Sequence, residues 1–505
     1  MQWHNDDSLT LLETPVRLGT VASDLGLARQ AQPGWAAQSV RQRLRLIRRV
    51  RHLVAAQALS LAQTVASVTR RSPAETLVAE ILPLADACRF LEREASRLLK
   101  PQRLSVWSRP FWLTGAKLEI HRESLGVVLI IAPSNYPVFL AGVQLLQALA
   151  AGNAVLLKPG EGASAAAVAL THICCAAGLD PRLIRVLPEP PTAVQEAITA
   201  GVDKVILTGK AETGAAVLAE LAPSLTPATL ELSGCDAAFV CEDADIDLAA
   251  MALQYSLRLN GGATCIAPRR VFVARALADA LETRLASLVQ HLPPSPVAPA
   301  MLSRVQHLVA EAYSQGARRL SGTYCPDGAM TPMIVTNAKP AMRLLQEDVF
   351  APVLALVPVD DNAEALRAAN GCPYALGATI FAKADTARRL ARHIRAGVVV
   401  INDVIVPTAD PRLPFGGRGR SGYGVTRGAA GLLELTAIKA ITTRSGRWRP
   451  HYEPLQLGDD SLFQTYIAAV HAASWRQRAA AWVACGRALM ARSRRGPHAD
   501  TEDQP

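Results

Sequence analysis

Residues 260–268 read Asn-Gly-Gly-Ala-Thr-Cys-Ile-Ala-Pro and contain one side chain that can attack an electrophile, the thiol of Cys265. A thiolate is the strongest nucleophile that side chains offer near neutral pH. The small residues in front of Cys265 would leave it open to a substrate. The pattern makes Cys265 a candidate nucleophile, although a cysteine can equally be a structural residue.

The other cysteines form no recognisable pattern. The chain has nine, an odd number, and none belongs to a Cys-x-x-Cys pair. A disulfide framework or a zinc site would show paired, regular spacing. We therefore expect no metal and a reducing, cytoplasmic compartment, and the polar first ten residues do not read as a secretory signal.

Two further segments could hold a nucleotide. In residues 207–214, Gly209 and Gly214 flank a turn from a strand to a helix, where backbone N–H groups can approach a pyrophosphate. In Lys-Pro-Gly-Glu, Lys158 and Glu161 follow another strand, and such a pair could hold the hydroxyls of a ribose. Either pattern also occurs in ordinary turns, so neither identifies a nucleotide site alone.

A parallel sheet must position these segments. Strands are expected at residues 126–131, 154–157, 184–187 and 204–207, and helices at 138–151, 163–178 and 193–200. Continuous apolar strands that alternate with helices are typical of a parallel sheet covered on both faces. A second α/β unit follows, with strands at 237–240, 271–273, 333–335, 353–357, 377–381 and 397–402, and helices at 247–259, up to 292, 362–370 and 385–396. The fold class is therefore α/β.

Composition excludes several classes of protein. Of 505 residues, 50% are hydrophobic and 19% charged, which rules out a disordered chain. Residues 125–157 carry no charge, but Pro133, Pro137 and Gly152 interrupt them, so we expect no membrane span. The net charge is +10, and the arginine-rich residues 35–71 read as a solvated helix face; we expect no nucleic-acid partner.

The C-terminal stretch differs from the rest. Residues 461–495 read as one long amphipathic helix with many arginines, followed by a polar, disordered end at 496–505. Such a helix could lie on an anionic membrane, dock on a partner subunit or pack on its own core. The sequence leaves these alternatives open.

Several motifs occur in order along residues 127–442 and together resemble the NAD(P)-dependent aldehyde dehydrogenase superfamily. They are Pro-Ser-Asn-Tyr-Pro at 133–137, Lys-Pro-Gly-Glu at 158–161, the turn at 207–214, Leu-Glu-Leu-Ser-Gly at 230–234, the cysteine segment, Glu-Asp-Val-Phe-Ala-Pro at 347–352 and Pro-Phe-Gly-Gly at 414–417. Cys265 lies 34 residues after Glu231, the interval that the family uses between its base and its nucleophile.

The resemblance implies a set of site residues. Cys265 would attack the aldehyde carbon, Asn135 would donate to the oxyanion, and Glu231 would activate the water that hydrolyses the thioester. The cofactor residues that it implies are Lys158, Glu161, Gly209, Lys210, Gly214, Asp348 and Phe350. The substrate-pocket residues, none of them charged, are Tyr136, Val404, Ile405, Val406 and Phe415.

In detail the motifs are most similar to the class 3, fatty aldehyde branch, as in Asn-Asp-Val-Ile-Val at 402–406. The apolar pocket then implies a fatty, isoprenoid or aromatic aldehyde. Four residues depart from the family pattern around the cofactor, namely Ser134, Lys210, Ala263 and Asp348. Glu161 places a carboxylate where a 2′-phosphate would lie, so we expect NAD to be preferred and NADP to be tolerated.

Two other functions fit the same residues. In a CoA-acylating aldehyde dehydrogenase, or an acyl reductase, a thiol would replace water. Because of the four departures, a catalytically silent relative that serves as a binding or scaffold protein is also possible on sequence alone. Retention of Glu231 argues against the CoA-acylating enzyme, and a test of nicotinamide nucleotide binding would discriminate the silent relative.

The resemblance also implies the architecture: a Rossmann-type cofactor domain, an α/β catalytic domain and a small β element for oligomerisation. The expected segments are 1–229 for N-terminal helices and cofactor domain, 230–403 for the catalytic domain, 404–450 for the return to the cofactor domain, and 451–505 for the basic helix and tail. A hairpin at 105–123 would pair with 437–443 in a homodimer or homotetramer.

Overall fold

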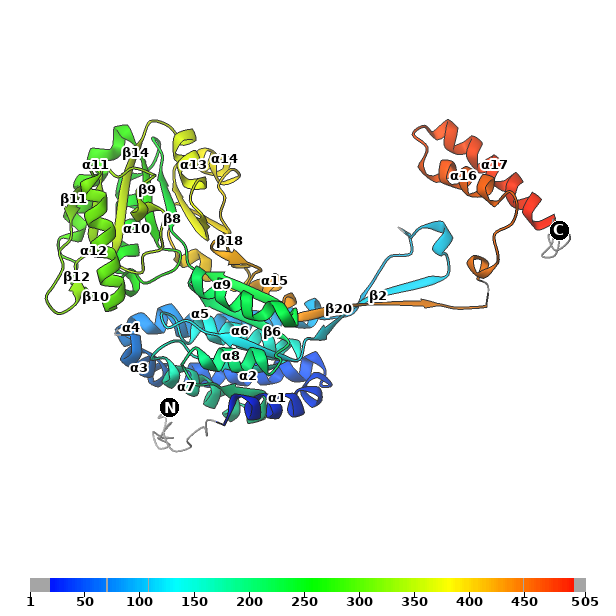
Figure 1. Ribbon diagram of the computed structural model, residues 1–505, viewed down its shortest axis with the longest axis horizontal. Helices are drawn as coiled ribbons and strands as arrows, with labels where there is room; N and C mark the ends of the chain where they lie inside the picture. The colour runs from blue at the N-terminus through cyan, green and yellow to red at the C-terminus, as the bar shows by residue number, and fades with distance from the viewer. Residues whose placement is uncertain (1–18, 70, 108, 448, 495–505) are drawn as a thin grey trace, which may run out of the picture. The chain divides into compact units, whose positions relative to one another are not determined.

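The computed structural model describes residues 19–69, 71–107, 109–447 and 449–494 (Figure 1). They form two compact units. One comprises Met1–Leu104 and Glu119–Ile441, and the other comprises Ser105–Leu118 and Thr442–Pro505. The first unit contains both large sheets, and the second contains two C-terminal helices.

The first large sheet has six strands in the order β19-β7-β6-β3-β4-β5. They are β3 (Val127–Ile131), β4 (Ala154–Lys158), β5 (Ile184–Val186), β6 (Lys204–Gly209), β7 (Ala228–Leu232) and β19 (Gly422–Tyr423). All neighbours run parallel except β19, which pairs antiparallel with β7. The four predicted strands are confirmed, and their carboxyl ends share one edge of the sheet.

Helices cover both faces of this sheet (Figure 1). The crossover helices are α6 (Phe139–Ala151), α7 (Ser164–Ala176), α8 (Thr192–Thr199) and α9 (Ala211–Leu221). The N-terminal helices are α1 (Val21–Ala36), α2 (Val40–Ala56), α3 (Ala58–Thr69), α4 (Pro73–Thr76), the π-helical turn η1 (Leu77–Ile81) and α5 (Leu82–Leu98). Every residue of α6 is buried, which explains why residues 138–151 carry no charge.

The second large sheet has seven strands in the order β11-β13-β14-β9-β8-β16-β17. They are β8 (Asp236–Val240), β9 (Pro268–Ala274), β11 (Arg318–Ser321), β13 (Met333–Thr336), β14 (Val353–Val359), β16 (Gly377–Phe381) and β17 (Val398–Ile401). Only β11 is antiparallel to its neighbour. The six predicted strands of this unit are confirmed.

Alternate residues of these strands face different helices, as the period of two requires. Val271 packs with α10 (Ile246–Arg258) and α11 (Ala278–Val289), whereas Phe272 packs with α12 (Pro299–Ser314), α13 (Asn362–Asn370) and α14 (Ala384–Ala391). The sequence did not predict α12. Proline at its first position is the usual sign of a helix start.

Smaller elements complete the fold. β1 (Gln102–Arg103), β2 (Ala116–Ser124) and β20 (Thr436–Arg444) form a three-stranded sheet in that order. β10 (Ser295–Pro296) pairs with β12 (Ala329–Met330), and β15 (Tyr374–Ala375) pairs with β18 (Arg418–Gly419). A short helix, α15 (Gly428–Leu433), precedes β20.

The predicted hairpin at 105–123 is wrong in its first half. Its second strand is β2, but the partner that β2 meets in antiparallel register is β1, which lies before residue 105. The described residues between 105 and 115 contain a single 3₁₀ turn, Phe111–Leu113, and no strand. The hairpin therefore closes over a longer connection than the alternating pattern suggests.

The single C-terminal helix predicted at 461–495 is also wrong. The chain forms α16 (Asp459–His471) and α17 (Trp475–Arg494), separated by an extended Ala472. The hydroxyl of Ser474 accepts from the N–H of Gln477 at 3.2 Å, and the Gln477 side chain accepts from the Ser474 N–H at 3.3 Å. This reciprocal pair is a capping box, which begins a new helix. Residues 495–505 lie outside the described residues.

Two arginines of the predicted solvated face, Arg43 and Arg71, are buried. Arg43 donates to the carbonyls of Ala150, Ala36 and Gln38 at 3.0, 3.1 and 2.5 Å. It therefore ties α2 to the end of α6. None of the helices over the described residues combines the length and the hydropathy that a membrane span requires.

Candidate active site

The loop in front of Cys265 has a backbone that its sequence explains. Asn260, Gly261 and Gly262 all have positive φ, at 50°, 57° and 74°. A Cβ on Gly262 would lie 2.7 Å from the backbone of Pro352, so no side chain fits there. The left-handed turn leaves Cys265 between the loop and the start of β9, which agrees with the small-residue pattern.

A buried arginine that the sequence analysis missed holds this loop. Arg269, in β9, donates to the carbonyls of Gly262, Thr264 and Ala351. Burial lowers its pKa. Arg269 was hard to recognise from the sequence, because an arginine inside an apolar strand gives no indication of which carbonyls surround it.

Cys265 itself lies in apolar surroundings. It packs with Ile266, Leu376 and Phe415, and Ile405 belongs to the same cluster. Burial raises the pKa of its thiol, and the carboxylate of Glu231 raises it further. The charge of Glu231 therefore acts on the Cys265 thiol.

Glu231 lies near the carboxyl end of β7 and is buried. One carboxyl oxygen, Oε2, accepts a hydrogen bond from the hydroxyl of Thr426 at 2.5 Å. The other, Oε1, is buried and has no hydrogen-bond partner among the described residues. Burial raises the pKa of this carboxyl, while Arg427 and the Thr426 hydroxyl oppose the rise. The free oxygen could take a proton from a water molecule.

Asn135 follows β3 and reaches the loop in front of Cys265, residues 260–264, which we call the nucleophile loop. Its side-chain amide donates to the carbonyl of Ala263 at 2.9 Å. The Asn260 side chain donates to the same carbonyl at 3.1 Å and to the Asn135 carbonyl at 3.2 Å. This bond engages one of the two N–H groups of the Asn135 amide, which leaves the second for another acceptor.

Tyr136 is fixed beside the same loop. Its hydroxyl is 2.7 Å from the hydroxyl of Thr264, and the Arg71 guanidinium lies 4.9 Å from its ring centre. Arg71 pairs with the buried Glu80 of η1, which accepts from the N–H groups at the start of α6. Burial raises the pKa of both Tyr136 and Glu80. Tyr136 is therefore held rigidly beside the loop that carries Cys265.

The three predicted pocket residues at 404–406 face different surroundings. Ile405 has φ 58° and ψ −64°, and the Val406 N–H donates to the Val404 carbonyl at 2.5 Å. This is a γ-turn that is strained for a β-branched residue. Ile405 packs in the cluster with Cys265, Val404 is fully buried, and Val406 is 53% exposed.

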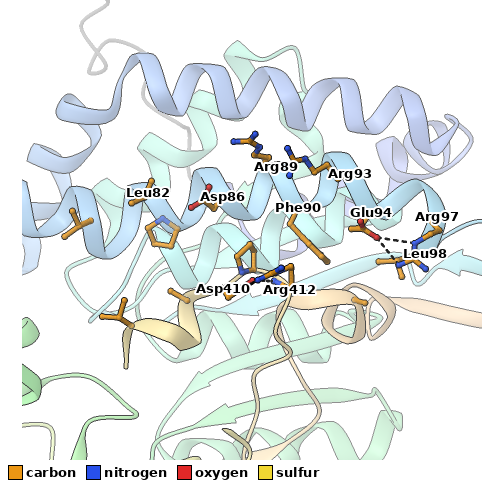
Figure 2. Close-up of a pocket in the computed structure, with 16 residues that line it drawn as sticks. Leu82, Asp86, Arg89, Phe90, Arg93, Glu94, Arg97, Leu98, Asp410 and Arg412 are labelled. Atoms are coloured by element: carbon orange, nitrogen blue, oxygen red, sulfur yellow. Dashed lines mark hydrogen bonds and ion pairs between the residues drawn. The ribbon is translucent and has the colours of Figure 1, made fainter. Parts of the chain in front are cut away.

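Val406 lines a groove of about 960 Å³ beside α5 (Figure 2). We call it the α5 groove. Its walls come from residues 78–98 and from 406–412, with Ala429 between them. Val78 and Leu82 present exposed apolar side chains to it. Figure 2 shows Arg412 paired with Asp410 and Arg97 paired with Glu94 along the groove.

A second buried arginine, Arg427, was also missed. Its guanidinium lies 4.1 Å from the ring centre of Phe415 and 5.6 Å from that of Phe139, and it donates to the Thr408 carbonyl at 2.7 Å. Its φ of 61° and ψ of 170° fall in a region that is nearly exclusive to glycine. Such a conformation is destabilising by about 1–3 kcal/mol, and it persists only where the surroundings impose it.

The segments predicted for a nucleotide gather at the carboxyl edge of the first sheet. Lys158 ends β4 and is half-buried, and Glu161 is exposed in the turn after it. A Cβ on Gly160 would lie 2.5 Å from the N atom of Ser134, so this turn packs directly on the loop that carries Asn135. Burial lowers the pKa of Lys158, and the negative charges of Glu189 and Glu161 oppose this change.

The turn from β6 to α9 differs in part from its prediction. Gly209 ends β6 and Lys210 precedes α9 without a side-chain cap, so the first N–H groups of α9 are open to an anion. Gly214 lies inside α9, where a Cβ would be 2.8 Å from the Leu232 side chain. The second glycine thus allows the helix to pack on β7.

Asp348 and Phe350 precede β14. Asp348 is buried, and its Oδ1 atom has no hydrogen-bond partner among the described residues. Burial raises the pKa of the carboxyl, and the charges of Arg269, Arg304 and Lys210 oppose this. Phe350 is half-buried against the core of the second sheet. No group of three or more His, Cys, Asp or Glu in the described part of the chain is arranged to hold a metal ion.

Comparison with known proteins decides the family. The model of the aldehyde dehydrogenase family matches residues 20–441, which is most of the chain. The chain belongs to the aldehyde dehydrogenase family. It has the aldehyde dehydrogenase fold, it is an NAD(P)-dependent enzyme, and its chemistry is the oxidation of aldehydes.

Individual relatives agree with this assignment. The chain is 31% identical over 471 residues to 4,4′-diapolycopene aldehyde oxidase of Methylomonas sp, covering 88% of each protein. Among solved structures, an NAD-dependent aldehyde dehydrogenase of Sinorhizobium meliloti has a TM-score of 0.80 at 28% identity, covering 85% of this chain and 88% of that one. NADP-dependent glyceraldehyde-3-phosphate dehydrogenase of Bacillus halodurans, complexed with NADP, has a TM-score of 0.79 at 28% identity, covering 84% and 91%.

The residues present fit a nicotinamide dinucleotide. The unpartnered Oδ1 of Asp348 is an acceptor that a ribose hydroxyl would satisfy. The open N–H groups of α9, with Lys210 beside them, would meet a pyrophosphate. When bound, this cofactor supplies the hydride acceptor for aldehyde oxidation.

Proposed function

We propose that this enzyme oxidises a lipophilic aldehyde to its carboxylic acid through a thioester on Cys265. The observation that carries the proposal is the apolar cluster of Ile266, Leu376 and Phe415, against which both Cys265 and Ile405 pack. Burial of each CH₂ group contributes about 0.8 kcal/mol to binding, so an apolar substrate gains most here.

The residues divide the chemistry among them. The Cys265 thiolate forms a bond to the aldehyde carbon, and the carbonyl oxygen becomes an oxyanion that the free N–H of Asn135 can bind. After oxidation, the acyl group is held as a thioester. Glu231 then takes a proton from water through its unpartnered oxygen, hydroxide adds to the acyl carbon, and the carbon–sulfur bond breaks to return the thiolate and release the acid.

The α5 groove supports a long substrate. Ile405 packs in the cluster with Cys265, and the next residue, Val406, lines the groove. A chain that leaves the Cys265 cluster could continue along the exposed side chains of Val78 and Leu82. The relative named as an oxidase of diapolycopene aldehyde also supports a lipophilic substrate and, with the 402–406 motif, the fatty aldehyde branch.

A series of straight-chain aldehydes tests the substrate proposal. We expect kcat/KM to rise from acetaldehyde to decanal, and the substitution Leu82→Gln to flatten the rise only for the longer members. Leu225→Gln, which alters an exposed leucine after α9, serves as the control. If acetaldehyde is oxidised more efficiently than decanal, the lipophilic pocket is excluded. Added CoA should not speed turnover, because the role proposed for Glu231 is to activate water.

We also propose that NAD is preferred over NADP. Glu161 is an exposed carboxylate after β4, and its charge acts on Lys158, the other member of the candidate ribose pair. A 2′-phosphate next to this carboxylate would be repelled. Glu161→Gln should lower the KM for NADP more than that for NAD. A wild-type KM for NADP well below that for NAD would contradict the assignment.

The C-terminal unit is proposed to contact a membrane surface. Phe463, Ile467 and Leu489 are exposed on α16 and α17, near several arginines of α17. Near an anionic leaflet each such arginine would add about 1 kcal/mol. Glutamine at all three positions should weaken binding to phosphatidylserine vesicles without changing kcat/KM. Unchanged vesicle binding would favour a subunit contact instead.

For assembly we propose a homodimer or homotetramer in which β20 contributes. Most of its residues from Ala437 to Thr443 are exposed in the single chain. A long exposed strand normally meets another strand or is covered. Light scattering of the purified protein should give a dimer or tetramer mass, and a monomer at micromolar concentration would contradict this proposal.

A further inference from the structure

Arg427 is a cation for which the surrounding structure provides only partial compensation. It is 5% exposed, and among the described residues its guanidinium donates one hydrogen bond, from Nη1 to the Thr408 carbonyl. Its Nε atom is buried and has no partner among the described residues. An unpaired buried guanidinium is destabilising, so its presence calls for an explanation beyond packing.

The position of Arg427 relates it to both reacting side chains. The preceding residue, Thr426, donates its hydroxyl to Glu231 at 2.5 Å. The guanidinium stacks on Phe415, a member of the apolar cluster against which Cys265 packs. Its charge acts on the Glu231 carboxyl and on the Cys265 thiol.

The other charged groups near Cys265 do not supply an uncompensated positive charge. Glu231, Asp236 and Asp348 all oppose a thiolate, although burial raises the pKa of each and so favours its neutral form. Tyr136 is held neutral by burial in the same way. Arg269 also acts on Cys265, but three backbone carbonyls accept from its guanidinium.

We propose that Arg427 is a positioning residue whose buried charge stabilises the thiolate of Cys265 and the carboxylate of Glu231. In the resting enzyme the cation offsets the negative charge that each of these groups carries when it is reactive. Its unpartnered Nε–H is the donor left free for this purpose. The inference rests on the proposed roles of Cys265 and Glu231, but not on the identity of the aldehyde.

The rate of Cys265 alkylation by iodoacetamide, measured against pH, tests the inference without any substrate. Mass spectrometry of the peptide that carries Cys265 separates it from the other cysteines. Arg427→Gln should move the alkylation profile to higher pH by about one unit, which lowers the rate about tenfold on the rising limb. Arg427→Lys keeps the charge and should restore most of the wild-type profile.

Controls separate this role from a structural one. Arg43→Gln removes another buried arginine, bonded only to backbone carbonyls, and should leave the profile unchanged. If Arg427→Gln does not fold, Arg427→Met retains the unbranched stem that packs on Phe415. A folded Gln or Met variant with the wild-type profile would overturn the inference. A shifted profile combined with preference for acetaldehyde would overturn only the lipophilic substrate.

Discussion

The nucleophile loop and the C-terminal helix pair are stabilised in opposite ways. The loop around Cys265 is bonded to side chains of distant segments: Asn135 donates to the Ala263 carbonyl, and Glu75 accepts from the Asn260 N–H. The pair α16–α17 is held by contacts within itself, such as Arg492 with Asp459 at 2.8 Å and the edge-to-face rings of Tyr466 and Trp482. Changes in the loop should therefore alter the chemistry, and changes in the helix pair should leave it unaltered.

The largest effect is expected from Cys265→Ala. Without the thiol no thioester forms, so aldehyde oxidation should fall below detection, while NAD binding, followed by fluorescence titration, should stay near wild type. Cys175→Ala, in the half-buried cysteine of α7, is the matched control and should retain activity. Turnover by the Cys265→Ala protein at the wild-type rate would contradict the site.

Glu231→Gln should slow thioester hydrolysis by about 10²–10⁴, the usual contribution of a general base. The pre-steady-state burst of NADH should persist, because hydride transfer precedes hydrolysis. Burial raises the pKa of Glu231, so the rate of hydrolysis by the wild type should increase with pH as this carboxyl loses its proton. The Gln variant should not show this increase. Glu242→Gln, at an exposed carboxyl, is the control and should change neither the rate of hydrolysis nor its dependence on pH. A variant that abolishes the burst would argue against the assigned step.

Asn135→Ala should lower kcat/KM by about 10²–10³, as loss of one oxyanion donor typically does. The Asn260 side chain also donates to the Ala263 carbonyl, so the loop should keep its conformation and the thermal midpoint should change little. Measurement of kcat/KM and of the thermal midpoint separates a role in oxyanion binding from a role in holding the loop. A loss of stability without a loss of kcat/KM would make Asn135 a structural residue.

The smallest effect is expected in the other region. Ser474→Ala removes the cap of α17 and should destabilise that helix by about 1 kcal/mol, seen as faster amide exchange in its first turn. Aldehyde oxidation should be unchanged. Ser461→Ala, in the first turn of α16, is the control. If Ser474→Ala changed kcat/KM, the two regions would be coupled and the contrast between them would fail.

Much of the framework was predictable because its signals are local. Residues 127–131 are all apolar and all buried, and so are residues 154–157 of β4 and 205–207 of β6. The Asn-Gly-Gly turn in front of Cys265 needs left-handed backbone, which those residue types adopt readily. The capping box at Ser474 and Gln477 was also legible in the sequence, but the apolar residues on both sides of it suggested one continuous helix.

The sequence by itself determined most strands of the two large sheets, the turn in front of Cys265 and the family to which the motifs belong. Only the tertiary structure decided which charged side chains are buried. Arg427 meets Phe139, Thr408 and Phe415, which come from separate segments, and Arg43 meets carbonyls at the end of α6. Whether an arginine faces water or the nucleophile depends on what packs around it, and that is set by contacts between residues far apart in the chain.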